Sequence, residues 1–177
     1  MRKKASSIEP KVLSEAEAWP RLLRYCAFQE RAPAEVLKKM RGYHLPPDAQ
    51  ERLLGRLKEE NYLSVDRFTE TYAGGKLRSN RWGGRKIAMG LAAKGIEKEV
   101  ISEKLAAMPT EDFRAALRTL LERRDESQYK HLPPAERRQK LYRLGLSRGF
   151  ASDLVAEEVK RLTGGRVEDD FDEGAAT

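Results

Sequence analysis

The sequence predicts an all-helical (all-α) fold, built as an elongated array of three tandem three-helix repeats. Two observations lead to this prediction. Apolar residues recur at helical spacing through most of the 177 residues, and no window alternates apolar and polar residues for long enough to indicate a strand. One pattern of apolar residues also returns three times along the chain, which is typical of a repeat architecture.

The first repeat is expected over residues 15–63. Leu22 and Cys26 lie on one face of its first helix, because they are four residues apart. Pro33 suits the first turn of a second helix, and Pro46 precedes a third. Cys26 is the single cysteine of the chain, so it cannot form an intramolecular disulfide and is expected to be a buried small hydrophobe.

The second and third repeats are expected over residues 64–108 and 109–163. If one equivalent position is occupied by Val36, Ile87 and Leu141, the ninth residue after it is apolar in every repeat: Leu45, Ile96 and Phe150. One such repeat is too small to bury a core alone, so we expect neighbouring repeats to stack on each other. The alternative is one irregular helical bundle whose apolar spacing matches by chance.

The two ends of the chain are expected to be flexible, with a polar lead at residues 1–14 and an acidic tail at 164–177. Five acids and no lysine or arginine follow Arg166, so the rest of the chain carries +12 instead of the formal +7. Such a surplus favours a polyanionic partner, although a membrane surface or an acidic protein would also attract it. No apolar run is long enough for a signal peptide or a membrane span. We therefore expect a cytoplasmic monomer with no membrane contact.

The candidate binding site begins in the stretch Thr71–Ile96, which has six basic residues and no Asp or Glu. Basic side chains around an aromatic ring and a Gly-Gly turn are typical of a contact with a nucleic-acid strand. The alternative is a solvated helix face with a buried Trp82. The candidate residues of this stretch are Lys76, Arg78, Arg81, Trp82, Arg85, Lys86 and Lys94.

The third repeat carries a similar charge pattern, since Ser127–Ser152 contains six basic residues and one acid, Glu136. We expect its basic face to continue that of the second repeat. Its candidate residues are Arg137, Arg138, Lys140, Arg143 and Arg148. Within the first of these stretches, Gly90 and Ala93 leave a strip of low side-chain bulk, which either a neighbouring helix or a ligand would fill.

The sequence offers no catalytic residues, no metal site and no cofactor motif. His44 and His131 each precede Leu-Pro-Pro and lie outside any metal-binding or nucleophile pattern. The run Gly74-Gly75-Lys76 differs from a phosphate-binding loop, because Leu77 stands where Ser or Thr is needed. We therefore expect a binding protein and not an enzyme.

Three groups of residues carry a resemblance to a known family: Glu59–Leu63 with Asp66, Arg67, Phe68 and Tyr72; Arg85–Ile87 with Leu91 and Lys94–Ile96; and Lys140–Leu144 with Arg148–Phe150. Through these groups the chain, between about Trp19 and Leu162, resembles the RecX family of regulatory proteins, which modulate the recombinase RecA. The chain departs from the family pattern at His44-Leu45, where Gly and an aromatic residue are usual, and at Gly145, where a larger apolar residue is usual.

The resemblance implies tandem three-helix repeats that bind the RecA filament on DNA. It also implies restraint of the recombinase, ATPase and coprotease activities of RecA, and thereby regulation of DNA repair and recombination. The implied partners are the RecA filament and single-stranded DNA, with double-stranded DNA as a second candidate. Two alternatives are a general DNA-binding helical protein and an α-helical scaffold for an acidic protein.

Overall fold

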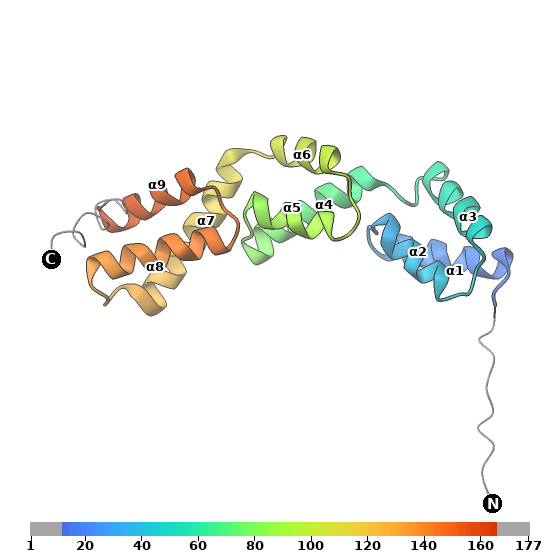
Figure 1. Cartoon of the computed structure of the whole chain (residues 1–177), viewed down its shortest axis with the longest axis horizontal. Coiled ribbons are helices and arrows are strands. Elements are labelled where there is room, and N and C mark those ends of the chain that lie inside the picture. Colours follow the sequence, from blue (N-terminus) through green and yellow to red (C-terminus); the bar gives the residue numbers. More distant parts are fainter. Residues whose placement is uncertain (1–11, 166–177) are drawn as a thin grey trace, which may run out of the picture. The chain divides into compact units, whose positions relative to one another are not determined.

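The computed structural model describes residues 12–165, and within this range all regular structure is helical (Figure 1). The all-helical prediction is thus confirmed for the described residues. The elements in chain order are α1 (Glu15–Phe28), α2 (Pro33–Arg41), α3 (Pro47–Glu59), α4 (Val65–Asn80), α5 (Gly84–Ala92), α6 (Lys98–Ala106), α7 (Thr110–Arg124), the π-helix η1 (Asp125–Tyr129), α8 (Pro134–Ser147) and α9 (Ser152–Thr163). None of these helices is long and apolar enough to cross a membrane.

The chain divides into two compact units, and the division falls inside α4, between Phe68 and Thr69. We call residues 12–68 unit 1 and residues 69–165 unit 2. The division into three repeats and their elongated stacking stay predictions. Residues 1–11 of the expected lead and 166–177 of the expected tail lie outside the described residues.

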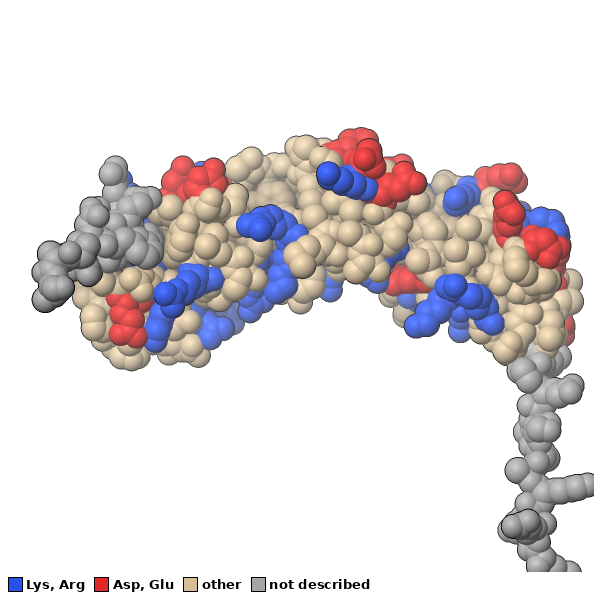
Figure 2. Space-filling view, in the orientation of Figure 1, with Lys and Arg blue, Asp and Glu red and all other residues tan. Residues whose placement is uncertain are grey.

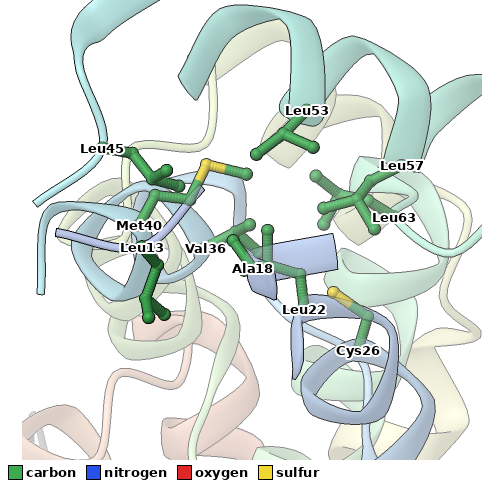
Figure 3. Packing of buried hydrophobic residues seen from close by; sticks show 10 residues of the cluster. All are labelled: Leu13, Ala18, Leu22, Cys26, Val36, Met40, Leu45, Leu53, Leu57 and Leu63. Atoms are coloured by element: carbon green, nitrogen blue, oxygen red, sulfur yellow. The ribbon is translucent and has the colours of Figure 1, made fainter. Parts of the chain in front are cut away.

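Unit 1 has a core of apolar side chains from α1, α2 and α3 (Figure 3). Residues four apart on each helix share one face, so a single face of each helix is buried. The fully enclosed residues include Leu22 on α1, Met40 on α2 and Leu57 on α3. Cys26 is buried as expected, and burial raises the pKa of its thiol, which keeps it protonated and unreactive.

Residues just before the first helix are part of the folded unit. Leu13 falls within the expected polar lead, yet its side chain belongs to the buried core and its N–H donates to the Tyr43 carbonyl at 3.1 Å. Ser14 then caps α1, because its hydroxyl accepts from the Glu17 N–H while the Glu17 carboxylate accepts from the Ser14 N–H.

The three equivalent apolar residues Leu45, Ile96 and Phe150 are all buried. The residue before each adopts a positive φ: 56° at His44, 76° at Gly95 and 85° at Gly149. The same left-handed turn therefore ends the second helix of each predicted repeat and directs the following apolar side chain into the core.

Candidate nucleic-acid interface

The loop between α4 and α5 lies directly against the turn that follows α8. The Gly83 N–H donates to the Arg148 carbonyl at 2.8 Å, and the Arg85 N–H donates to the Gly149 carbonyl at 3.1 Å. A Cβ at Gly83 would overlap the Gly149 carbonyl group, and one at Gly149 would lie 2.5 Å from the Lys86 nitrogen. Both positions therefore require glycine for the two backbones to approach.

This contact brings the two basic stretches of the sequence together within unit 2. The Lys86 ammonium lies 3.5 Å from the Ser147 carbonyl, and the Arg148 guanidinium lies 3.4 Å from the Asn80 carbonyl. Figure 2 shows Lys and Arg side chains gathered where α5 and α8 meet. Residues about sixty positions apart in the sequence thus share one surface.

Lysine ammonium groups and aromatic rings alternate on this surface. Lys76 and Lys86 lie 4.9 and 5.2 Å from the centroid of the half-buried Trp82 ring. Lys76 and Lys94 lie 5.3 and 5.7 Å from the centroid of the Tyr72 ring. These distances are within the range of cation–π attraction. We call the set Tyr72, Lys76, Trp82, Lys86 and Lys94 the α4–α5 face.

Tyr72 also explains the low-bulk strip at Gly90. A Cβ at Gly90 would overlap the Tyr72 hydroxyl, so the ring occupies the space that a side chain would take. Of the two alternatives that the sequence left open, a neighbouring helix fills the strip. Trp82 is neither a fully enclosed core residue nor a freely exposed ring, since its side chain is half-buried with ammonium groups beside it.

Several basic residues of unit 2 have no acidic partner among the described residues. Within residues 12–165, no Asp or Glu oxygen lies within 4.0 Å of the charged groups of Lys76, Lys86 or Arg148. The same holds, over that range, for Arg78, Arg81, Arg85 and Arg143, but Arg78 and Arg81 line a groove with Asp112, and Arg85 lines another with Asp153 and Glu157. The Lys76 and Lys86 ammonium groups, both beside the Trp82 ring, create a positive potential that attracts a polyanion.

Other candidate residues have partners within the protein. Arg137 donates to both oxygens of the buried Asp125, at 2.7 and 2.6 Å, and thereby joins α8 to η1. These hydrogen bonds raise the pKa of Arg137 and hold its guanidinium in place. Lys140 pairs with Glu136 at 2.9 Å. The structure therefore does not bring Arg137 and Lys140 to the α4–α5 face.

The remaining two candidates lie on α8. Arg143 is exposed, whereas Arg138 is half-buried and its guanidinium passes close to Gly165, where an added Cβ would lie 2.7 Å away. Arg138 is thus near the end of the described chain and not beside the loop that holds Trp82.

Two arginines that sequence reasoning missed lie beside Arg81. A groove of about 740 Å³ next to η1 is lined by Arg81, Arg123 and Arg124 among others. Nothing in the sequence indicated a basic site at Arg123 and Arg124, because the neighbouring residues Glu122, Asp125 and Glu126 are acidic. Glu122 and Glu126 line the same groove, where Glu122 pairs with Arg161 at 2.6 Å and Glu126 with Lys130 at 2.9 Å.

The described residues contain no group of His, Cys, Asp and Glu that could hold a metal ion. The fold and this surface together define a helical protein with a basic face.

A family model described as "RecX, second three-helix domain" matches residues 66–105. The regulatory protein RecX of Leptothrix cholodnii is 30% identical over 142 residues, which cover 79% of this chain and 85% of the relative. The RecX of Clostridium perfringens strain 13 is 31% identical over 136 residues, covering 73% of this chain and 60% of the relative. The chain therefore belongs to the RecX family of regulatory proteins, and it spans about 60% of the length of the clostridial relative.

The fold is also that of solved RecX structures. The crystal structure of RecX from Lactobacillus salivarius superposes with a TM-score of 0.77 and covers 84% of this chain and 96% of its own, at 20% sequence identity. A second RecX crystal structure gives a TM-score of 0.73 at 24% identity. At such identities the likeness shows the fold.

Proposed function

We propose that this protein regulates the RecA recombinase by binding to the filament that RecA forms on DNA. Its main effect is inhibition of the recombinase, ATPase and coprotease activities of RecA, and it thereby regulates DNA repair and recombination in the cytoplasm. Membership of the RecX family supports this proposal, because the relatives are named regulatory proteins. The observation that carries it is the α4–α5 face, where the Lys76 and Lys86 ammonium groups have no carboxylate within 4.0 Å in residues 12–165.

The geometry of this face favours contact with phosphates over contact with bases. Stacking a base on Trp82 or Tyr72 would require an open ring surface, but both rings are half-buried and have lysines beside them. The rings instead restrict the lysines, so less side-chain entropy is lost when a phosphate binds. Phosphate contacts carry no sequence information, so we propose binding that is independent of base sequence.

A pair of double variants tests this proposal. Lys76→Gln with Lys86→Gln removes two ammonium groups from the α4–α5 face. Lys58→Gln with Lys98→Gln removes the same charge from exposed positions on α3 and α6 and serves as the matched control. Removing one phosphate-binding cation lowers the magnitude of the slope of log affinity against log salt by about 0.7 on single-stranded DNA. We expect a slope smaller by about 1.4 for the first variant and an unchanged slope for the control.

The same variants are then added to RecA filaments on DNA, and ATP hydrolysis is measured. We expect the Lys76/Lys86 variant to lose inhibition while the control inhibits like the parent. Equal inhibition by both variants would show that the α4–α5 face is not the filament-binding site. If the unmodified protein binds bare DNA but leaves RecA unaffected, it is a general DNA-binding protein. If the unmodified protein binds neither DNA nor RecA filaments, it is a scaffold for another protein.

A further inference from the structure

Unit 1 carries a second surface on which cations and aromatic rings alternate. The Arg31 guanidinium lies 3.9 Å from the centroid of the Tyr25 ring, and Lys39 lies 5.6 and 5.5 Å from the Tyr25 and Tyr43 rings. Arg21 lies 6.0 Å from the Tyr43 ring. We call the set Arg21, Tyr25, Arg31, Lys39 and Tyr43 the α1–α2 face.

The buried residues define how the helices of this face correspond to α4 and α5. Val36 of α2 and Ile87 of α5 are both fully buried and lie 51 residues apart in number. The same interval relates three buried residues of α1 to three of α4: Ala18, Leu22 and Cys26 correspond to Thr69, Ala73 and Leu77. The same offset of 51 residues therefore aligns α1 with α4 and α2 with α5.

At this offset, four of the five positions of each face correspond, and at these four the cation and the ring are exchanged, whereas Lys86 corresponds to Glu35 and Lys39 to Gly90. The pair Tyr25 and Arg31, 3.9 Å apart, corresponds to Lys76 and Trp82, 4.9 Å apart. The pair Arg21 and Tyr43, 6.0 Å apart, corresponds to Tyr72 and Lys94, 5.7 Å apart. Both faces thus hold a cation beside an aromatic ring. The position that carries the cation in one face carries the ring in the other.

The α1–α2 face also has uncompensated charge. Within the described residues, no carboxylate oxygen lies within 4.0 Å of the charged groups of Lys38, Lys39 or Arg21. Lys38 and Lys39 line a groove of about 490 Å³ together with Tyr25, Tyr43 and Glu35. The Glu35 carboxylate accepts the Ala32 N–H at 3.2 Å as part of the α2 cap. Figure 2 shows Lys and Arg side chains gathered over α1 and α2.

We propose that the α1–α2 face is a second binding surface for nucleic-acid phosphates. The choice of nucleic acid as the partner rests on the proposed function. It is favoured by the exchanged pairs, because a strand presents the same ligand, a phosphate, to every surface that meets it. The Lys38 and Lys39 ammonium groups, which have no carboxylate within 4.0 Å among the described residues, also complement the negative charge of a phosphate backbone.

The test uses the full chain and bare single-stranded DNA, so its result does not depend on RecA. Lys38→Gln with Lys39→Gln alters the α1–α2 face and the groove that it shares with Lys38, and the Lys58/Lys98 double variant is again the matched control. We expect the salt slope to fall by about 1.4 in the Lys38/Lys39 variant and to stay at the parental value in the control. Combining it with the Lys76/Lys86 changes is expected to lower the slope by about 2.8.

Three outcomes would overturn the inference. In the first, the Lys38/Lys39 variant keeps the control's slope and affinity. In the second, bare DNA binding is unchanged but binding to RecA filaments is abolished, which would assign the face to an acidic protein. In the third, the combined variant is no weaker than the Lys76/Lys86 variant alone. A different result would contradict the proposed function: the unmodified protein would have no effect on RecA filaments.

Discussion

The backbone of His44 adopts a left-handed conformation that costs a non-glycine residue free energy. Its φ of 56° matches those of Gly95 and Gly149 at the equivalent positions. A side chain in this region strains the backbone by about 1–2 kcal/mol, whereas glycine adopts it freely. The departure from the family's glycine at this position therefore has a measurable consequence for stability.

We expect His44→Gly to raise the free energy of unfolding by up to about 1 kcal/mol, because the relief of strain exceeds the added flexibility of the unfolded chain. Gly95→Ala is the reciprocal change and should lower it by about 1 kcal/mol. Urea denaturation of both variants measures the effect. A His44→Gly protein less stable than the parent would show that the imidazole makes a stabilising contact larger than the strain.

Glu158 is a buried carboxylate held by three arginines of unit 2. Its side chain is 2% exposed and accepts from Arg118, Arg161 and Arg114, at 2.7 to 3.2 Å, so that α7 is joined to α9. Burial by itself raises the pKa of Glu158, but the three hydrogen bonds outweigh it and lower the pKa to about 2. The ionised form is therefore the one that stabilises the fold.

Because the folded pKa lies below the ordinary value of 4.5, the contribution of Glu158 is present above pH 4.5 and is lost as the pH falls toward 2. We expect Glu158→Gln to lower the free energy of unfolding at pH 7 by about 1.5–3 kcal/mol, since a neutral amide loses the charge-assisted hydrogen bonds from the three arginines. It should also flatten the pH dependence between 4.5 and 2.

Glu157→Gln is the control for this change, because Glu157 is exposed and pairs with the same Arg114 at 2.9 Å. It should cost less than about 1 kcal/mol. Chemical denaturation across the pH series measures both variants. Parallel pH profiles for the parent and Glu158→Gln would contradict the assigned role.

At the scale of secondary-structure elements, the contact between the α4–α5 loop and the turn after α8 determines where the basic residues lie. This contact is made by backbone atoms, and Gly83 and Gly149 permit it. We expect Gly149→Ala to lower the free energy of unfolding by about 2–4 kcal/mol, because its Cβ would meet the Lys86 backbone and its φ of 85° disfavours a side chain. DNA affinity should fall as well, since Lys86 and Arg148 would move apart.

Gly75→Ala provides the matched control within unit 2. Gly75 lies in α4, and an added Cβ would have no heavy atom within 4 Å. This change should raise the free energy of unfolding by about 1 kcal/mol and leave DNA affinity unchanged. If Gly149→Ala were as stable as the parent, the backbone contact would not be needed for the fold of unit 2.

At the scale of the whole molecule, the matched positions predict that the helical repeats fold cooperatively. Ile96 is 6% exposed at the end of the turn that begins with Gly95. We expect Ile96→Asp to abolish most of the cooperative thermal melt, because it buries a charge without a partner. Ile96→Val should cost only about 0.5–1.5 kcal/mol. Circular dichroism during heating tests both, and an Ile96→Asp protein that melts like the parent would contradict the repeat interpretation.

The helical class and much of the core were predictable from the sequence because periodicity is a local property of the chain. The burial of Leu45, Ile96 and Phe150 follows from apolar residues that recur at matched spacing. The absence of acids between Thr71 and Ile96 was also visible, and it marked the stretch that contains the α4–α5 face. These features depend on residue order and composition alone.

Only the tertiary structure decided which charged residues are available for binding. Arg137 and Lys86 look alike in the sequence, but the first pairs with the buried Asp125 and the second lies beside Trp82 with no carboxylate near it in the described residues. Likewise, only the fold shows that Tyr72 fills the strip at Gly90. The physical reason is that the free energy of a charge depends on the groups a few ångströms away in space, and chain folding determines which groups those are.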